Sequence, residues 1–176
     1  MEMSKEALWV LRAQCDDREA LELLLRSVQP SLLHYLCGIV GSADADDILQ
    51  EVLVIVFRKL RWLECPELFR PWAFRIASRA AFRHLKRKKQ RQAHDEELLY
   101  VASVLDAPPS TELLQQLANN SAISPASRAV LVLHFQEEMP LPAVAAILEV
   151  PIGTVKSRLA YGLAALRKQF TKKRRF

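Results

Sequence analysis

The 176-residue chain is poor in the residues that tight turns and sheets need, with only 4 glycines and 3 tyrosines. This scarcity argues against a β-rich fold and against a glycine loop that cradles phosphate. No run of 18 apolar residues occurs, so no membrane-spanning helix is expected. The first residues lack a basic stretch followed by an apolar one, so no secretory signal is expected.

Cysteine and histidine are also scarce. Cys15, Cys37 and Cys65 are odd in number and far apart, which disfavours a disulfide framework and favours a reducing cytoplasm. No serine–histidine–aspartate or cysteine–histidine arrangement indicates nucleophilic catalysis. His34 and Cys37 share one predicted helix, but two ligands are too few for zinc. We therefore expect no catalytic residue, no metal, no cofactor and no enzyme activity of the chain's own.

The distribution of charge says more than the net value of +5. Residues 70–91 hold nine basic residues and no acidic one, and residues 156–176 hold eight basic residues and no acidic one. These two runs contain 17 of the 25 basic residues, so the rest of the chain is strongly acidic. Two basic runs on an acidic body predict two separate contacts with a polyanion, although such runs are often merely solvated helix ends.

Apolar residues recur at helical spacing along most of the chain, which predicts an all-α fold. The pattern gives helices over residues 5–28, 31–40, 44–62, 71–91, 111–120, 125–137, 141–148 and 152–170. We expect Pro30 to end the first helix and Gly41 to close the second. Residues 93–112 contain an acidic triplet and a proline pair, which predicts a flexible linker between two small helical domains, 1–92 and 113–176.

Residues 140–161 have the length and rhythm of a helix-turn-helix. Val155 and Leu159 are apolar at i and i+4, which leaves on the opposite face Lys156, Ser157, Ala160 and Tyr161. Cations and hydroxyls on such a face can donate to phosphates and base edges. The periodicity alone also allows an ordinary helical hairpin with a solvated face.

Acidic residues gather on one face of the third predicted helix, where Asp44, Asp47 and Glu51 are spaced i, i+3 and i+7. This face can be simply solvated, can contact a basic protein surface, or can repel DNA. It can also hold Mg²⁺, although no converging carboxylate or histidine is evident.

The helix predicted over residues 71–91 combines aromatic rings with cations. Its rings are those of Trp72, Phe74 and Phe82, and its cations are Arg75, Arg79, Arg83, Lys86 and Arg87. Rings and cations together hold single-stranded nucleic acid by stacking and phosphate contact. For Trp72 and Phe74, core packing is favoured over stacking.

Both halves of the sequence resemble a known family. Residues 123–170, with the string GTVKSRL at 153–159, resemble the C-terminal domain of a bacterial sigma factor of the sigma-70 family, in its extracytoplasmic-function (ECF) class. The strings DADDILQEVLVIVFRKL at 44–60 and RPWAFRIASRAAFRHLKRKKQR at 70–91 are similar to sigma domain two of that class.

The resemblance implies a non-catalytic specificity subunit that docks on core RNA polymerase and directs transcription initiation. Sigma domain four would dock on the β flap and recognise the minus-thirty-five promoter element through Thr154, Lys156, Ser157, Arg158, Ala160 and Tyr161. Sigma domain two would bind and melt the minus-ten element through Trp72, Arg75, Arg79, Arg83, Lys86 and Arg87. The acidic helix would contact the β′ clamp coiled coil through Asp47, Gln50 and Glu51. The further expectations are an anti-sigma factor as partner, no membrane insertion, and a cytoplasmic location on the nucleoid.

The sequence departs from the family pattern at several positions. Family members often have larger or cationic side chains where Ala160 and Tyr161 stand. Glu149 stands at the helix-turn-helix turn position usually held by glycine, where a left-handed backbone costs a residue with a side chain about 1 kcal/mol. Arg79 and Arg83 stand where the family commonly has Asn and Asp, and both arginines strengthen attraction to phosphate.

Two other functions stay open from the sequence. A dimeric helix-turn-helix repressor or activator would explain the C-terminal half, but not the acidic helix and the ring-bearing basic helix before it. A Mg²⁺-dependent enzyme that processes nucleic acid would use Asp44, Asp47 and Glu51.

Overall fold

The structure, a computed structural model, describes residues 4–94 and 123–173. Within these ranges every regular element is a helix, which confirms the predicted all-α class. The first range contains α1 (Lys5–Gln14), α2 (Arg18–Val40), α3 (Ser42–Lys59), the short 3-10 helices η1 (Leu60–Trp62) and η2 (Pro66–Leu68), and α4 (Phe69–His94). The second contains α6 (Pro125–Leu131), the π-helix η3 (Val132–Gln136), α7 (Leu141–Leu148) and α8 (Ile152–Lys173).

The single helix predicted over residues 5–28 is wrong, because the chain turns between α1 and α2. Asp16 adopts φ 64°, the left-handed conformation that Asp tolerates better than most residues. Asp17 then caps α2: its carboxylate accepts a hydrogen bond of 3.0 Å from the backbone N–H of Ala20. That bond, with a second from the Arg12 guanidinium, holds the pKa of Asp17 below its usual range.

Pro30 does not end a helix, as the sequence analysis expected, but lies inside α2. Its ring removes one backbone hydrogen bond, yet Pro30 itself is exposed, on the solvent side of the helix. The opposite side carries an unbroken buried stripe formed by Leu24, Val28, Leu32, Tyr35, Leu36 and Ile39. Each of these large apolar side chains gains about 1.5–3 kcal/mol from burial, so the stripe outweighs the lost bond. By length and composition α2 could also cross a membrane, but core helices pass the same test and this stripe lies in the core.

The other helices follow the predicted ranges closely, with three differences. The third predicted helix is α-helical only to Lys59 and continues to Trp62 as the 3-10 helix η1. The helix predicted over 125–137 changes at Val132 into a π-helix, in which the N–H of Glu137 donates to the carbonyl of Val132 at 3.1 Å. The basic helix α4 extends to His94, past the expected start of the linker at residue 93. The remainder of that linker and the helix predicted over 111–120 lie outside the described residues.

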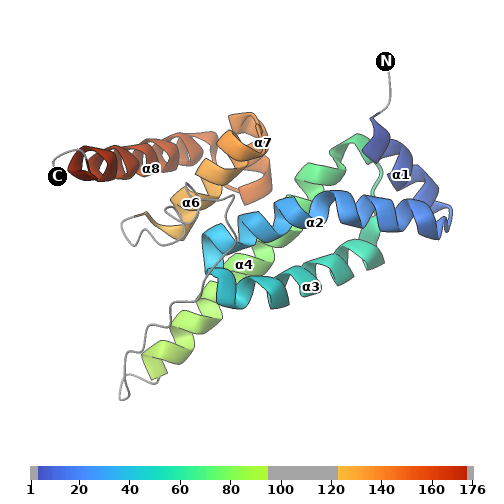
Figure 1. Cartoon of the computed structure of the whole chain (residues 1–176), viewed down its shortest axis with the longest axis horizontal. Coiled ribbons are helices and arrows are strands. Elements are labelled where there is room, and N and C mark those ends of the chain that lie inside the picture. The colour runs from blue at the N-terminus through green and yellow to red at the C-terminus, as the bar shows by residue number, and fades with distance from the viewer. Residues whose placement is uncertain (1–3, 95–122, 174–176) are drawn as a thin grey trace.

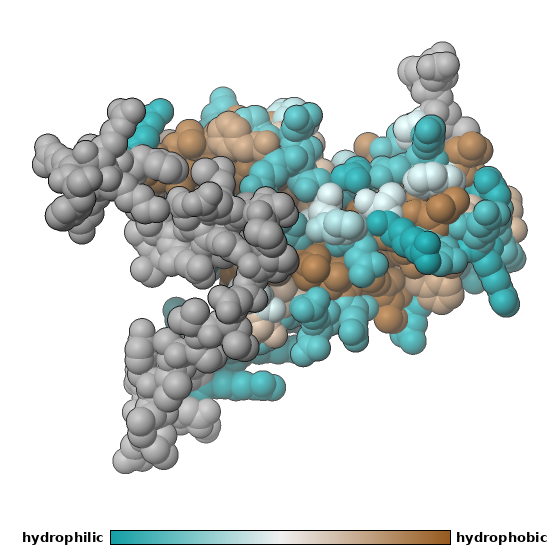
Figure 2. All heavy atoms as spheres, in the orientation of Figure 1, coloured by the Kyte–Doolittle hydropathy of each residue, from teal (hydrophilic) through white to brown (hydrophobic). Residues whose placement is uncertain are grey.

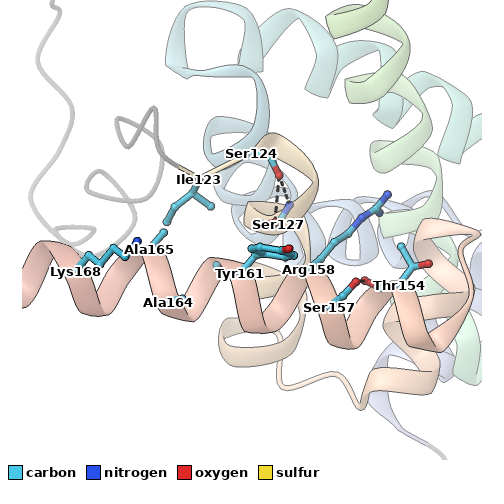
Figure 3. Close-up of a pocket in the computed structure, with 11 residues that line it drawn as sticks. Ile123, Ser124, Ser127, Thr154, Ser157, Arg158, Tyr161, Ala164, Ala165 and Lys168 are labelled. Atoms are coloured by element: carbon cyan, nitrogen blue, oxygen red, sulfur yellow. Dashed lines mark hydrogen bonds between the residues drawn. The ribbon is translucent and has the colours of Figure 1, made fainter.

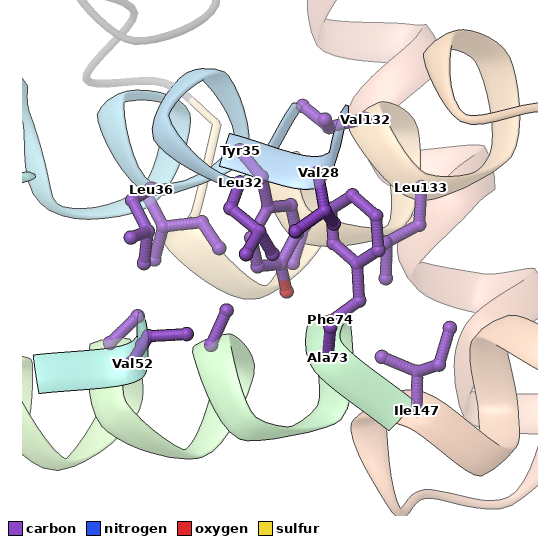
Figure 4. Close-up of a cluster of buried hydrophobic side chains, with 14 of the residues drawn as sticks. Val28, Leu32, Tyr35, Leu36, Val52, Ala73, Phe74, Val132, Leu133 and Ile147 are labelled. Carbon is purple, nitrogen blue, oxygen red and sulfur yellow. The ribbon is translucent and has the colours of Figure 1, made fainter. Parts of the chain in front are cut away.

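The two described ranges pack against each other: α6 lies on α2, and α7 lies on α4 (Figure 1). One apolar cluster joins them, which contains Val28 and Leu32 of α2, Val132 and Leu133 of η3, and Ile147 of α7 (Figure 4). The halves are in contact at Gly38, where an added Cβ would lie 3.5 Å from Cγ2 of Val132, an ordinary van der Waals distance.

A buried hydroxyl pair ties α2 to α4 inside this cluster. The Ser78 hydroxyl donates to the carbonyl of Phe74 at 2.7 Å, so the Tyr35 hydroxyl donates to Ser78 at 2.6 Å. The Tyr35 ring meets that of Phe74 edge to face, with ring centroids 5.3 Å apart. Burial raises the pKa of Tyr35 well above its usual range, so the hydroxyl keeps its proton.

The substitution Tyr35→Phe is expected to lower the free energy of unfolding by about 1 kcal/mol, because it leaves the buried Ser78 hydroxyl with one hydrogen bond fewer. Urea denaturation monitored by circular dichroism measures this change. The matched control is Tyr161→Phe, which removes a hydroxyl from a side chain that is 75% exposed and should leave stability unchanged. Equal stability of Tyr35→Phe and the wild type would mean that the hydroxyl pair makes no net contribution.

Candidate nucleic-acid interface

Helix α8 presents the polar face that the sequence predicts. It follows α7 through the turn Glu149–Pro151, and its Val155 is fully buried against the rest of the helix-turn-helix. Exposed on the other side are Lys156, Ser157, Ala160 and Tyr161, while Thr154 and Arg158 are half-buried at its edge. The helix therefore carries cationic and hydroxyl donors on one accessible face, which is what contact with phosphates and base edges requires.

A groove runs along α8 beside the start of α6 (Figure 3). Thr154, Ser157, Arg158 and Tyr161 line it from α8, together with Lys168 further along the helix. The opposite wall carries Ser124 and Ser127, which the sequence analysis did not include in the site. The Ser124-Pro125 pair signals a helix start, but a helix start does not reveal which groove its hydroxyls will line. Ser124 caps α6, with its hydroxyl oxygen accepting a 3.2 Å bond from the N–H of Ser127.

The turn of the helix-turn-helix is left-handed at Glu149, with φ 54° and ψ 44°, as the family comparison of that position suggested. The carboxylate of Glu149 points to α4 and pairs with both Nε and Nη2 of Arg79, the first at 3.0 Å. This pair, with a weaker contribution from Arg75, holds the pKa of Glu149 below its usual range. The most unusual residue of the turn is thus bound to the basic helix of the other range.

On α4, the structure separates the rings from the cations. Phe74 is fully buried and belongs to the core, and Trp72 is half-buried with its ring centroid 6.2 Å from that of Phe69. Phe74 therefore packs in the core, as the sequence analysis favoured, while Trp72 packs there only in part. Lys86 and Arg87 are exposed. Arg83 is also on the surface, but it pairs with the carboxylate of Glu51 on α3.

The acidic face of α3 lies beside the basic helix α4. Asp44 accepts from Nζ of Lys88 at 2.8 Å, and Nε2 of His84 lies 3.1 Å from the same carboxylate oxygen. The hydrogen bond from Lys88 is the main reason why the pKa of Asp44 is below its usual range. Glu51 is paired with Arg83. The other exposed residues named for this face are Asp47 and Gln50.

The same face of α3 continues into apolar residues. Val54 and Phe57, at i+4 and i+7 from Gln50, are 48% and 58% exposed. Figure 2 shows hydrophobic residues on the surface between α2 and α3, surrounded by hydrophilic ones. The sequence analysis missed this extension, although Val54 and Phe57 fall outside the buried stripe of α3 and could have been recognised by that criterion.

Two of the carboxylates that the sequence offers for Mg²⁺ lie beside cations of α4. Within residues 4–94 and 123–173, no group of three or more His, Cys, Asp or Glu side chains is placed to hold a metal ion. Of the three candidate carboxylates, Asp44 and Glu51 are already paired with cations of α4.

Comparison with known proteins decides the family. Residues 24–91 match the model "Sigma-70 region 2", and residues 121–168 match "Sigma-70, region 4". The chain belongs to the sigma-70 family. The two matches cover both halves, so a dimeric helix-turn-helix regulator, which would account only for the second half, is not needed to explain the sequence.

Curated relatives place this sigma factor in the ECF class. It is 29% identical over 140 residues to the ECF RNA polymerase sigma factor SigW of Bacillus subtilis, which covers 72% of this chain and 75% of the relative. It is 24% identical over 172 residues to the ECF RNA polymerase sigma-E factor of Escherichia coli K12, which covers 90% of each chain.

Solved structures share its fold. The sigma factor RpoE, in complex with the anti-sigma factor NepR from Bartonella quintana, matches with a TM-score of 0.72 and 23% identity over 85% of this chain and 96% of that one. CnrH, in complex with the cytosolic domain of CnrY, matches with a TM-score of 0.70 and 21% identity over 96% of this chain and 99% of that one.

The contact between α3 and α4 is testable by titration. Replacing Lys88 with Ala should raise the pKa of Asp44 towards its ordinary value of 3.8, because the main stabiliser of the carboxylate is removed. Carbon-detected NMR of the Asp44 carboxyl measures the shift. Because the folded-state pKa is lowered, the contact stabilises the fold above pH 3.8 and is lost as the pH falls through the folded-state pKa.

The matched control is Lys89→Ala, which removes the same charge from the next position of α4, an exposed one. An unchanged Asp44 pKa in Lys88→Ala, or an equal change in Lys89→Ala, would contradict the contact.

Proposed function

We propose that this ECF sigma factor assigns the three tasks of promoter recognition to three separate helical surfaces: α8, α4 and the acidic end of α3. The observation that carries the proposal is the exposed face of α8, where Lys156, Ser157 and Tyr161 stand opposite buried Val155 within the region 4 match. The chain's role is promoter recognition as an ECF sigma factor. On this proposal it has no catalytic activity, and the polymerase core supplies the chemistry.

In the proposed minus-thirty-five complex, α8 enters the major groove with its N-terminal half, as the second helix of a helix-turn-helix does. Lys156 and Arg158 contact phosphates, which gives affinity and fixes register. The hydroxyl of Ser157 donates to the carbonyl of Thr154 at 3.0 Å, so its lone pairs face outward as acceptors for a base amino group. Ala160 and Tyr161 offer small and aromatic apolar surface to thymine methyl groups.

In the proposed minus-ten complex, α4 supplies a cationic track rather than a stacking platform. The exposed end of the helix, including Lys86 and Arg87, follows the phosphates of the separated strand. Arg75, Arg79 and Arg83 extend the track towards the start of the helix. Of the rings on α4, Trp72 and Phe82 are both half-buried, and Trp72, in the first turn of the helix, is the one proposed to meet a flipped base.

The proposed contact with core polymerase is made by α3. Asp47 and Gln50 are exposed, Glu51 is the nearest carboxylate on the same face, and Val54 and Phe57 follow with apolar surface. A carboxylate ridge meeting a cationic coiled coil of the β′ clamp gives orientation and rapid association, and the apolar pair adds burial. The flap of the β subunit is the proposed contact of the C-terminal domain.

An anti-sigma factor is the proposed regulatory partner. The RpoE structure contains the anti-sigma factor NepR, and the CnrH structure contains the cytosolic domain of CnrY. By extension, a partner of this kind would hold the present chain in the cytoplasm, away from the nucleoid, until it is released to polymerase.

Replacing Lys156 with Ala should weaken binding of the holoenzyme to promoter DNA and reduce the slope of log affinity against log salt by about 1, because one phosphate contact is lost. Fluorescence anisotropy with labelled promoter DNA at several salt concentrations measures both quantities. The control is Lys5→Ala, which removes an exposed lysine from α1 and should change neither. An unchanged salt slope would remove Lys156 from the phosphate contacts.

Replacing Asp47 with Arg should weaken binding to core polymerase at least tenfold, because a like charge is placed against the cationic coiled coil. Titration of labelled sigma factor with core polymerase measures the affinity. The control Glu19→Arg makes the same charge change at an exposed carboxylate of α2, away from the proposed docking face of α3. If both variants lose affinity equally, the effect is one of overall charge and the docking assignment fails.

A further inference from the structure

The two halves of the molecule are joined by a specific polar contact at the edge of their apolar interface. Glu149, in the turn after α7, is bound by two nitrogen atoms of Arg79 on α4. A two-point contact between a guanidinium and a carboxylate fixes orientation as well as distance. The pair lies at the surface, with 61% of the Arg79 side chain and 48% of the Glu149 side chain exposed.

Other polar contacts cross the same interface. Arg70 of α4 donates to Glu137 beyond η3 at 3.2 Å and to Glu6 of α1 at 3.0 Å, and it thereby bridges two carboxylates from opposite halves. His34 of α2 lies 2.9 Å from the amide oxygen of Gln136. Apolar burial supplies most of the free energy of closure, and an exposed ion pair adds a small bias. A ligand that competes for Arg79 can reverse this small contribution to the closed state.

The closed arrangement conflicts with the proposed use of the same residues. Arg79 and Arg75 belong to the cationic track of α4, yet here Arg79 is neutralised by Glu149, and Arg75 is near enough to lower the pKa of that carboxyl. The two promoter elements are about 25 base pairs apart by their names, or roughly 85 Å of duplex at 3.4 Å per base pair. A compact chain of this length is only about 40 Å across. The closed form therefore cannot reach both elements.

We propose that the Arg79–Glu149 pair is an intramolecular latch, which adds to the apolar interface in favouring the closed free sigma factor and releases Arg79 to promoter phosphate when polymerase separates the two halves. This inference rests on the proposed function, because it assigns regulation to the surface proposed for the minus-ten element. Phosphate replaces the carboxylate at the same guanidinium, so one anion is exchanged for another. Residues 95–122 join the two halves, and a stretch of that length can extend to roughly 90 Å.

The decisive variant is Glu149→Gln, which keeps the size of the side chain and the left-handed backbone but removes the charge. Glu149→Gly removes the pair and also relieves the left-handed strain, so impaired folding cannot account for its effect. Glu138→Gln is the matched control: Glu138 is an exposed glutamate with a left-handed φ of 53°, and the substitution removes the same charge from the same half.

Closure is measured on the full chain with spin labels on exposed Cys15 and on Lys168→Cys, in a background of Cys37→Ala and Cys65→Ser. Distance distributions from pulsed electron resonance give the ratio of closed to open molecules. Glu149→Gln and Glu149→Gly should lower this ratio about two- to fivefold, as expected for one exposed two-point ion pair. Glu138→Gln should leave it unchanged. The exchange Arg79→Glu with Glu149→Arg should restore it.

Salt provides a second test, because screening weakens an exposed ion pair. Raising the salt concentration should lower the closed fraction of the wild type more than that of Glu149→Gln. An unchanged closed-to-open ratio in Glu149→Gln, or an equal fall in Glu138→Gln, would overturn the latch.

Binding to core polymerase separates failure of the latch from failure of the proposed function. If polymerase binds only the open form, Glu149→Gln should bind more tightly than the wild type by the factor that its open population gains. Wild-type protein that ignores core polymerase would refute the proposed function, while the distance measurement would still decide the latch. Tight binding by wild type and Glu149→Gln alike would leave the function standing and overturn the latch.

Discussion

The buried stripe of α2 is the contact on which the rest of the structure depends. It packs on α3 and α4 to form the first half of the molecule, and beyond Pro30 it continues against α6 and η3 of the second half. Because one helix belongs to both interfaces, the orientation of α4 and that of the helix-turn-helix are set by the same side chains. The two halves meet at Gly38, where an added Cβ would lie in ordinary van der Waals contact with Val132.

Charge in this sigma factor is largely balanced within the molecule. The basic run of α4 and the acidic face of α3 look independent in the sequence, yet Arg83 pairs with Glu51 and Lys88 with Asp44. Each pair is exposed and contributes little to stability. Each pair instead changes how strongly its cation attracts DNA, because a cation that already has a carboxylate partner attracts phosphate less strongly than a free one. The residues proposed for DNA and for polymerase are thus coupled before either ligand arrives.

Features of the structure that depend on residues close together in the sequence were predictable, and features that depend on distant residues were not. The bounds of α7 and the buried position of Val155 follow from local periodicity, and they were predicted correctly. The continuation of α2 through Pro30 was missed, because the energy that tolerates the proline comes from helices far away in the chain. The Arg79–Glu149 pair joins residues 70 positions apart, and nothing local indicates such a partner. The unusual residues at both positions were visible, but their relation was not.

The middle of the helix formed by α6 and η3 is covered on every side. Ala129 to Leu133 are five consecutive residues, all buried, and one helical turn takes only 3.6 residues. On one flank the cover is α8 and on another it is α2. Separating the two halves would remove α2 from this helix and expose Val132 and Leu133 to water. The exposed apolar surface would be prone to aggregation. The extended form is therefore poorly soluble by itself. A partner that separates the two halves must also cover the apolar surface that the separation exposes.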